Sequence, residues 1–561
     1  MSQGADKFAV ARALDEISRY LELGESNRFK ALAYERAARS LRSLDREPAD
    51  LIATGDLLKT PGIGKGTAAV IEELVRTGAS RYLDDLRKQY PPGIFGLMRV
   101  PSLGLKKIGI LYETLGIGSL DELEAAARAG KLAALHGFGP KTQQKILEGI
   151  EKARRRESQF LLPVGIEVGE MMREQLAAAD DVVNAEISGS VRRRLEVIRN
   201  VNVVVVTRAP ERVAAVLPNI VENVEVLDET TVKGVANGEV DVLFHFAKPA
   251  EFGALLLKTT GSSDFVEAFE KLRGGQALSP VRARRQARVP VFHGETEQDV
   301  FKNAGFAYVE PERRESADDL KRKRPRKLVE MSDLRGTFHV HTTFSDGRNT
   351  VFEMLDAARL RGFEYVGLTD HSKAAFYANG LTEARLPEQK AEIDAQRPRV
   401  APLRVFRGTE ADILPDGTID YADTGALAQF DFVVASVHSR FNMDRDEMTE
   451  RILRALDNPL VTFLGHLTGR LLLNRDGYTM EFDKVFERAG ERGVMIEING
   501  NPNRLDLDWR LIQRALDRGV LFSINPDAHS TAEYNALVSG TWVARKGGLS
   551  PRDIFNTRQV E

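Results

Sequence analysis

The stretch Thr337-Phe338-His339-Val340-His341 places two histidines two residues apart at the end of a short apolar run. Residues two apart on a strand share one face, so both imidazoles point to the same side. Six of the nine histidines lie between residues 336 and 530, each near the end of such a run and beside a carboxylate, hydroxyl or glycine. This bunching predicts a metal site in the C-terminal part of the chain.

Six further apolar runs follow the first, and helix-like stretches come after most of them. This alternation predicts β/α units around a parallel sheet. Closing the sheet into a barrel gathers the carboxyl ends of its strands, so the side chains that end the runs are expected to meet at one mouth. The runs are, or end in, residues 365–371, 408–412, 432–438, 461–466, 496–499 and 521–529.

Nine side chains near the ends of these runs are candidate metal ligands and catalytic residues. A single histidine could equally cap a strand or satisfy a hydrogen bond in the core, but six at equivalent positions beside three carboxylates do not fit that explanation. Imidazoles and carboxylates together suit zinc, manganese or iron, and nine ligands exceed the need of one ion. The candidates are His339, His341, Asp346, His371, Glu410, His438, His466, Asp527 and His529.

Residues 335–561 resemble the PHP family, polymerase and histidinol phosphatase. The matching motifs are His339-x-His341, Ser345-Asp346-Gly347, Thr369-Asp370-His371-Ser372, Gly408-x-Glu410, Ser436-Val437-His438-Ser439, Gly465-His466, Glu497-Ile498-Asn499 and Asp527-Ala528-His529. The resemblance implies a distorted seven-stranded β/α barrel, a trinuclear metal cluster held by the nine candidates, and metal-assisted hydrolysis of phosphoesters.

The charges of the candidates fit that chemistry. Three carboxylates offset half of the formal charge of three divalent ions, which leaves a cationic pocket for a phosphate. Such ions lower the pKa of a bound water and stabilise the attacking and leaving oxygens. Arg470 and Arg504 are candidate phosphate clamps or ordinary surface arginines. Asp370 either orients an imidazole or caps a turn.

Composition limits the remaining possibilities. A chain of 561 residues is long enough for roughly three to five domains, and 42% hydrophobic residues can build sizeable cores. The formal net charge of −3 excludes a uniformly basic nucleic-acid binder, so any such surface must be local. The chain has no cysteine, no signal-like start and no long apolar run, so we expect a cytoplasmic protein without disulfides.

The first 155 residues have a helical pattern with glycine-rich loops at 60–66 and 135–142 and a looser copy at 100–106. One such loop could be only a tight turn, but three resemble helix-hairpin-helix elements. These present backbone N–H groups and a helix N-terminus to DNA phosphates and do not read sequence. The candidate DNA contacts in the loops are Gly62, Gly64, Lys65, Gly104, Gly137, Gly139 and Lys141.

From about residue 160 to 318 the pattern mixes helix and strand. Gly189-Ser190-Val191-Arg192-Arg193 resembles the nucleotide-binding motif of the family X DNA polymerase palm, and Thr260-Gly261-Ser262 and residues 306–315 resemble motifs of its thumb. Together with the hairpins and the PHP region, nearly the whole chain resembles a bacterial family X DNA polymerase. The resemblance implies that Ser190 and Arg193 bind a triphosphate or DNA phosphate, and that Lys30 and Tyr34 contact a 5′-phosphate at a gap.

The chain departs from that family at the palm. Asn200 and Asn202 replace the family's Asp-x-Asp pair, Arg199 replaces a common glycine, and only Asp241 keeps its charge. Amide oxygens hold magnesium less well than carboxylates, and phosphoryl transfer depends on that ion. We expect a loss of polymerisation of at least about a thousandfold, or ~4 kcal/mol. Val70 stands at the lyase lysine position of some relatives, which excludes Schiff-base chemistry there.

The predicted fold class is multidomain, α+β and α/β: helical helix-hairpin-helix domains, a family X nucleotidyltransferase palm and thumb, and a distorted (β/α)7 PHP barrel. The basic run at 321–327 is expected to form an extended linker that either touches DNA or is only a solvated tether. The predicted boundaries are 1–85 and 86–157 for the hairpin domains, 158–250 for the palm, 251–318 for the thumb, 319–334 for the linker and 335–561 for the PHP domain.

The predicted function is a DNA-repair, base-excision-type 3′–5′ exonuclease that uses divalent metal ions, three per PHP domain. Manganese is the first choice, zinc and iron are alternatives, and magnesium is not expected at the palm. Expected partners are gapped, nicked or single-stranded DNA ends, with deoxynucleotides a further candidate, and we expect a monomer associated with the nucleoid when on DNA. The alternatives are an active gap-filling polymerase, a non-catalytic gap-binding scaffold and a small-molecule phosphatase.

Overall fold

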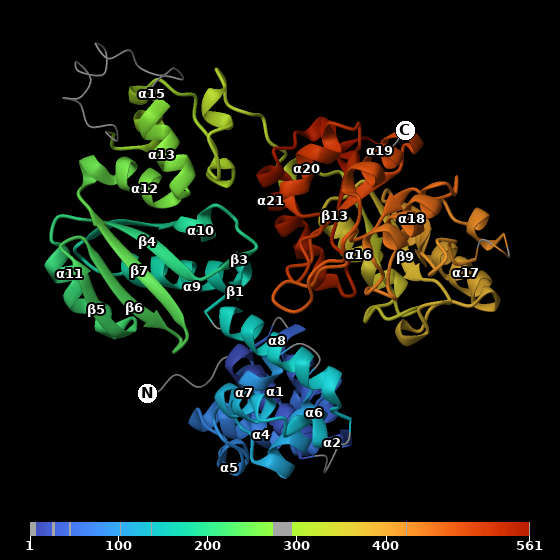
Figure 1. The fold of residues 1–561 in the computed structure, drawn as a ribbon, viewed down its shortest axis with the longest axis horizontal. Coiled ribbons are helices and arrows are strands. Elements are labelled where there is room, and N and C mark those ends of the chain that lie inside the picture. The colour runs from blue at the N-terminus through green and yellow to red at the C-terminus, as the bar shows by residue number, and fades with distance from the viewer. Residues whose placement is uncertain are drawn as a thin grey trace. The chain divides into compact units, whose positions relative to one another are not determined.

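The computed structural model describes residues 7–24, 28–43, 46–100, 103–135, 137–156, 158–272, 294–421, 423 and 425–559. The chain forms two compact units, Met1–Glu157 and Ser158–Glu561, whose elements are labelled in Figure 1. Among the described residues, no helix combines the length and apolar character that crossing a membrane requires.

The first unit consists of short amphipathic helices around one core. Leu14, Ile71 and Leu111 are fully buried in it, and the charged residues of these helices lie mostly outside. The α-helices are α1 (Lys7–Leu23), α2 (Arg28–Ser43), α3 (Pro48–Thr54), α4 (Lys65–Thr77), α5 (Arg81–Gln89), α6 (Leu105–Leu115), α7 (Leu120–Arg128) and α8 (Pro140–Arg156). Single 3₁₀ turns, η1 (Leu57–Lys59), η2 (Ile94–Arg99) and η3 (Leu132–Ala134), precede the three glycine loops.

The three glycine loops share one local structure. In each loop an apolar residue, Ile63, Leu103 or Phe138, is buried and donates its N–H to the carbonyl three residues before it, at 3.1 Å in every case. A glycine directly precedes the next helix in each loop: Gly64 before α4, Gly104 before α6 and Gly139 before α8, whose second residue is Lys141. The repeated geometry confirms the helix-hairpin-helix prediction.

The second unit begins with a palm-like sheet of order β2-β4-β7-β6-β5. Strands β4 and β7 are parallel and the other neighbours antiparallel. The strands are β2 (Val182–Ser188), β4 (Asn200–Thr207), β5 (Glu222–Asp228), β6 (Thr231–Ala236) and β7 (Val240–Ala247), with β1 (Phe160–Leu161) and β3 (Val197–Ile198) as a separate pair. Helices α9 (Leu162–Ala177), α10 (Gly189–Arg192) and α11 (Pro210–Val216) complete this region.

Helices α12 (Phe252–Thr260), α13 (Ser263–Leu272) and α15 (Glu297–Ala304) form the thumb-like part, and residues 273–293 of the predicted thumb lie outside the described residues. Buried Glu297 joins it to the palm, since both guanidinium Nη atoms of Arg192 donate to its carboxylate at 2.7 Å. Burial opposes ionisation of Glu297, but Arg192 and Arg314 outweigh it and lower the pKa to about 2. Glu297 is therefore a charged link at neutral pH.

The C-terminal part is a nearly closed barrel of seven parallel strands in chain order, with helices outside them (Figure 1). Each predicted apolar run contains one strand: β8 (Gly336–Val340), β9 (Tyr365–His371), β10 (Arg404–Asp412), β11 (Phe432–Ser436), β12 (Phe463–Leu464), β13 (Met495–Asn499) and β14 (Phe522–Asn525). A parallel bridge from Val340 to Ala528 brings the first strand to the end of the last. The helices are α16 (Val351–Leu360), α17 (Leu386–Gln396), α18 (Arg445–Leu456), α19 (Phe482–Arg492), α20 (Trp509–Leu516) and α21 (Ala536–Gly547).

Within the second unit, charged side chains join palm and thumb to α20 and α21, and we call this contact the seam. Glu196 of the palm accepts hydrogen bonds from Trp509 Nε1 at 3.2 Å and Arg510 Nη1 at 2.7 Å. Lys546 Nζ donates to Glu315 Oε1 at 2.6 Å and to the Arg193 carbonyl at 3.0 Å. Burial lowers the pKa of Lys546 to about 8, although Glu315 acts in the opposite direction.

The basic linker adds to the seam. Its residues 322–330 lie outside any helix or strand, and Arg326 Nη1 donates to the Gly548 carbonyl at 2.7 Å. The segment is therefore anchored to the barrel at least at Arg326.

Candidate metal centre

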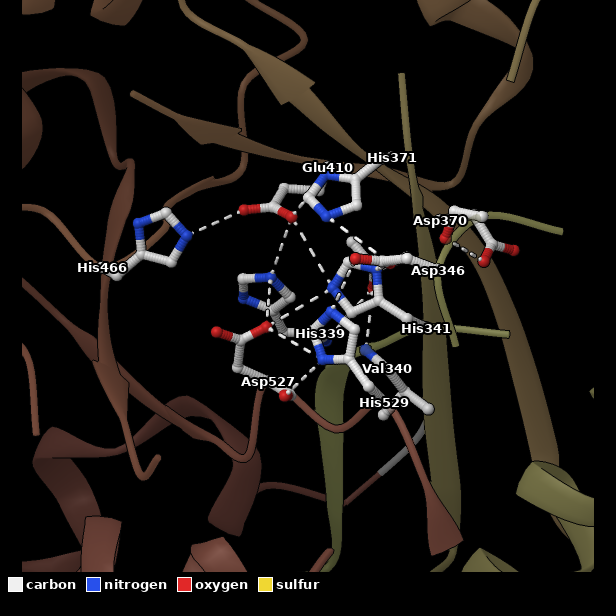
Figure 2. A network of polar contacts seen from close by, with 12 residues as sticks. His339, Val340, His341, Asp346, Asp370, His371, Glu410, His466, Asp527 and His529 are labelled. Carbon is white, nitrogen blue, oxygen red and sulfur yellow. Dashed lines mark hydrogen bonds and ion pairs between the residues drawn. The ribbon is translucent and has the colours of Figure 1, made fainter. Parts of the chain in front are cut away.

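The mouth of the barrel brings all nine predicted ligands together. Figure 2 labels all of them except His438. They fall into four overlapping groups, and within each group the candidate ligand atoms lie within 4.8 Å of one another. The groups are His341, Asp346, His371 and His529; His339, Glu410 and His466; His339, His341 and Asp527; and His371, Glu410 and His438. Shared members make the four groups one continuous cluster.

Glu410, near the end of β10, is the centre of this cluster. Its Oε2 lies 3.0 Å from His371 Nδ1, and its Oε1 lies 3.0 Å from His466 Nε2. Three other imidazoles lie 3.2 to 3.6 Å from its oxygens, those of His339, His341 and His438. A single buried carboxylate thus contacts imidazoles from strands or strand ends on several sides of the barrel.

Two acidic residues at the ends of other strands complete the cluster. Asp527 Oδ1 lies 3.4 Å from Nε2 of both His339 and His341. Asp346, on the loop after β8, lies 3.4 Å from His529 Nε2. His339, His466 and Asp527 have φ values of 61°, 25° and 53°, in the left-handed region. Residues other than glycine adopt this region at a cost in energy, and such strained residues are often found at functional sites.

Carboxylates that do not belong to the nine hold two of the imidazoles. Glu497 Oε2 lies 2.5 Å from His339 Nδ1, and Asp412 Oδ1 lies 2.7 Å from His438 Nδ1. Because an ionised carboxylate only accepts hydrogen bonds, we assign the proton to Nδ1 in both rings, which turns the Nε2 lone pair toward the cluster. Glu497 and Asp412 are site residues to which the sequence analysis gave no role, although both lie within the stretches quoted there.

Asp370 contacts a turn, and its carboxylate has no hydrogen bond to an imidazole among the described residues. Its carboxylate accepts from the Thr342 backbone N–H at 2.8 Å, from Ser345 Oγ at 2.8 Å and from Gln389 Nε2 at 2.8 Å. In Figure 2 it lies apart from the imidazoles. Of the two predicted roles the structure favours the turn, since Asp370 fixes the 342–345 loop that leads into Asp346.

The electrostatics of the cluster favour cations. Burial opposes ionisation of Glu410 and Asp527, but the surrounding histidines outweigh it and hold the pKa of each well below the usual range. The same balance lowers the pKa of Asp346 to about 2. Burial lowers the pKa of His371 to about 4, so that ring is neutral at pH 7. Anionic carboxylates beside a neutral imidazole are the donor set that a divalent ion requires.

The ring nitrogens also fit a metal. His339 Nε2, both nitrogens of His341, His371 Nδ1 and His466 Nδ1 are buried without a hydrogen-bond partner among the described residues. Buried polar atoms normally have such partners, so these nitrogens call for another one. Two ligand atoms that share a tetrahedral ion with bonds of about 2.1 Å lie roughly 3.4 Å apart, the range seen around Glu410 and Asp527. The residues present therefore fit divalent ions.

The two predicted phosphate clamps differ in their surroundings. Arg504 lies against the cluster, with its Nε 3.6 Å from Asp527 Oδ2, and one fifth of its side chain is exposed. Arg470 is engaged by the loop that follows β13, since it donates to Asp508 Oδ2 at 2.6 Å and to the carbonyls of Arg504 and Leu505. The geometry favours Arg504 as the residue that meets a phosphate and Arg470 as its support.

The palm lacks a comparable cluster among the described residues. Asn202 Nδ2 donates to Asn200 Oδ1 at 2.8 Å, and Asn202 Oδ1 lies 2.9 Å from His245 Nε2. Asp241, the retained carboxylate, is 2.9 Å from Lys233 Nζ. The two amides are occupied by each other and by a histidine, and the remaining anion is already paired with a cation.

The nucleotide motif of the palm contributes to structure. Arg193 Nε donates to Glu315 Oε1 at 2.9 Å and Nη1 to the Thr260 carbonyl at 2.7 Å. Ser190 is partly exposed on α10. Arg193 would have to leave its partners to bind a triphosphate.

The hairpin residues are mostly placed as a DNA-contacting surface requires. Gly62, Gly64, Lys65, Gly104, Gly137, Gly139 and Lys141 are exposed, and so is Lys30, whose Nζ donates to the Tyr82 hydroxyl at 2.7 Å. Tyr34 is 4% exposed and stacks on Tyr82, so its proposed phosphate contact does not fit its burial. Val70 is buried in the same core.

Comparison with known proteins agrees with this architecture. A model of the helix-hairpin-helix domain matches residues 6–80, a model of the SAM-like helix-hairpin-helix tandem matches 96–152, and a model of the PHP domain matches 337–501. The fold and site thus define a multidomain protein with DNA-binding hairpins and a metal-dependent PHP domain.

One curated relative matches over nearly the whole chain. The DNA polymerase/3′-5′ exonuclease PolX of Bacillus subtilis is 33% identical over 563 aligned positions, which cover 99% of this chain and 98% of the relative. The chain therefore belongs to the bacterial family X DNA polymerases that carry a C-terminal PHP domain.

Shorter matches cover the barrel. Probable phosphatases of Caldicellulosiruptor saccharolyticus and Photobacterium profundum are each 30% identical, over 34% and 35% of this chain and 78% of each relative.

Proposed function

We propose that this protein is a metal-dependent 3′–5′ exonuclease of DNA that acts through the barrel mouth, with a palm that no longer supports synthesis. The observation that carries the proposal is the cluster centred on Glu410, which contains nine candidate ligands. The palm, in contrast, has two amides in place of carboxylates. The name of the Bacillus subtilis relative, a DNA polymerase/3′-5′ exonuclease, supports DNA as the substrate. The small-molecule phosphatase alternative leaves the exposed hairpin loops without a role.

The chain's own residues prepare the site. Glu497 and Asp412 fix the rings of His339 and His438, so the donor atoms are oriented before a substrate arrives. Divalent ions bound there would polarise the phosphodiester and lower the pKa of a water nucleophile. Arg504 supplies a positive charge on the Asp527 side of the cluster, held by the hydrogen bond from Arg470 to its carbonyl.

The finer features of the proposal rest on the family resemblance and the donor chemistry. We infer three ions, with manganese preferred over zinc or iron, bound by the nine ligands. The exposed glycine loops would hold DNA through phosphates at a gap or nick, as in base excision repair, and leave the end for the barrel. We also infer that the protein is a monomer that acts in the cytoplasm and that its palm occasionally binds deoxynucleotides.

The experiment uses a 5′-labelled primer in a one-nucleotide gap, with manganese and all four deoxynucleotides. The wild-type protein is compared with a His339→Ala, His341→Ala double variant and with His245→Ala, a matched histidine variant in the palm. We expect a shortening ladder from the wild type and from His245→Ala, and none from the double variant.

Other outcomes would contradict parts of the proposal. A lengthened primer would show that Asn200 and Asn202 still support synthesis. An unchanged primer with tight gap binding would favour the scaffold alternative, and rapid hydrolysis of a small phosphomonoester without action on DNA would favour the phosphatase.

A further inference from the structure

Two exposed aromatic side chains lie beside the metal centre and have no part in its ligand set. Phe376 and Tyr377 belong to the 3₁₀ turn η9 (Phe376–Ala378), on the loop that follows β9 and its ligand His371. Phe376 is 85% exposed and Tyr377 61% exposed, although large aromatic residues normally bury most of their surface. Their rings contact each other edge to face, with centroids 5.9 Å apart. We call them the aromatic pair.

The loop holds the pair outward by burying its other apolar residues. Ala375, Ala378 and Leu381 are each at most 2% exposed. Asn379 has a φ of 54° and donates from Nδ2 to the Ser345 carbonyl at 3.2 Å, one residue before Asp346. The loop is thus attached to the same turn that carries a candidate ligand. A pair fixed in this way loses little conformational entropy when it binds a flat ligand.

Tyr377 lies beside the metal centre. The Tyr377 ring lies 6.5 Å from the His438 ring, at an interplanar angle of 72°. Desolvation, followed by the charges of Asp412 and Glu410, raises the pKa of Tyr377, so its hydroxyl lies within the field of the cluster. Arg504, 3.6 Å from Asp527 Oδ2, also acts electrostatically on that hydroxyl and opposes the rise of its pKa. An aromatic side chain, a cationic side chain and the candidate metal ligands therefore lie close enough to interact.

We propose that the aromatic pair stacks the base of the 3′-terminal nucleotide while the metal centre holds the phosphodiester that is cleaved. A nucleotide has a flat base on one side of its sugar and phosphates on the other, which matches an exposed aromatic surface beside a phosphate site. Stacking accepts all four bases, so this contact selects nucleic acid over other phosphoesters without reading sequence. The inference rests on the proposed function and names the feature of the substrate that the mouth recognises.

The experiment compares two 5′-labelled strands that differ only at the 3′-terminal residue, which carries thymine or is an abasic tetrahydrofuran. Hydrolysis breaks the same phosphodiester bond in both strands. Base stacking contributes about 1–3 kcal/mol, so the wild type should remove the residue with a base roughly 5- to 150-fold faster than the abasic one. The Phe376→Ala, Tyr377→Ala double variant should remove both residues at the abasic rate.

Two variants make the result specific. Tyr377→Phe keeps the ring and should keep the preference for the base. Leu360→Ala removes an exposed apolar side chain, 70% exposed at the end of α16, and should behave like the wild type. The inference would be overturned if the double variant were slowed equally on both strands. It would also be overturned if the double variant kept wild-type rates on both strands, and the pair would then be better explained as a contact for another protein.

A binding measurement separates this inference from the proposed function. A strand with 2-aminopurine at its 3′ end and a non-hydrolysable phosphonate in the last linkage loses fluorescence when the base stacks. Quenching by the wild type that is absent in the double variant would support the stacking site even if no strand were hydrolysed. Equal quenching by both proteins would exclude it.

Discussion

The palm and the barrel mouth both place polar side chains on parallel strands. Of the two, only the barrel mouth brings together, among the described residues, negative charge that bound cations can balance. On β4 and β7 two amides bond to each other and to His245, and Asp241 is paired with Lys233. In the barrel Glu410 contacts five imidazoles and remains anionic. The apolar core of the palm is intact, with Val203, Val204 and Val205 fully buried. The apolar core of this sheet therefore does not require carboxylates at positions 200 and 202.

The largest effect is expected from Glu410→Gln, which would make the barrel resemble the palm. The substitution keeps the shape and removes the charge that five imidazoles share, so exonuclease activity should fall at least about a thousandfold, or ~4 kcal/mol. The release rate of labelled nucleotides measures it. A chelator should silence the wild type to the same degree, and activity that survives both treatments would contradict the metal role.

The converse change tests the palm. In a Glu410→Gln background, which protects the product from digestion, Asn200→Asp with Asn202→Asp restores two carboxylates beside Asp241. We expect magnesium-dependent primer extension at least about a thousandfold above that of the unaltered palm. Adding Lys233→Ala frees Asp241 and should increase extension further. Equal extension with and without the restored carboxylates would refute our account of the palm.

A smaller effect is expected from Glu497→Gln, which alters only the orientation of a ligand. Glu497 also accepts hydrogen bonds from the backbone N–H of His466 at 3.1 Å and from Asn525 Nδ2 at 2.9 Å. Loss of such a supporting carboxylate typically costs 10- to 100-fold in metal affinity or activity. The manganese concentration for half-maximal activity should rise, and excess manganese should restore the rate. Glu297→Gln, an equally buried carboxylate in the thumb, should leave the manganese dependence unchanged.

The smallest effect concerns the seam between the two regions. Lys546 faces Glu315, Arg193 and Glu196, and its pKa falls from 10.5 to about 8 on folding. Between these values the unfolded chain binds more protons, so stability rises with pH, by about 1 kcal/mol from pH 8 to 9. Lys546→Met should lack this rise.

Urea unfolding followed by tryptophan emission measures this slope. The chain has two tryptophans, Trp509 and Trp542, and both lie in the seam. The Trp509 ring centroid is 4.5 Å from Lys546 Nζ, and the Trp542 ring centroid is 4.2 Å from Arg194 Cζ. Parallel slopes for wild type and variant would show that Lys546 does not change its protonation on folding.

The architecture and the convergence of the nine candidate ligands could be predicted because each depends on local pattern. A histidine at the end of a short apolar run reaches the barrel mouth regardless of the helix that follows, so His466 was predicted although β12 has only two residues. The three hairpins followed from repeated glycine spacing in the same way.

Roles that depend on register or on loop packing could not be predicted. Lys233 pairs with Asp241 across β6 and β7 as a diagonal neighbour, since Lys233 lies opposite Leu243. Asp370 and Glu497 both lie on barrel strands near their carboxyl ends, yet one faces a turn and the other an imidazole. Tyr34 and Arg470 were both candidates for phosphate contacts. In the structure Tyr34 packs against Tyr82 in the first unit, and Arg470 is hydrogen-bonded to the 504–508 loop.

Both arginines of the palm's nucleotide motif now support neighbouring parts of the second unit. Arg192 binds Glu297, Arg193 binds Glu315, and the Arg193 carbonyl receives Lys546 of the barrel. These contacts would preserve both arginines whether or not the palm supports synthesis. A genome survey that counts polymerases by this motif would therefore count residues whose observed contacts are structural.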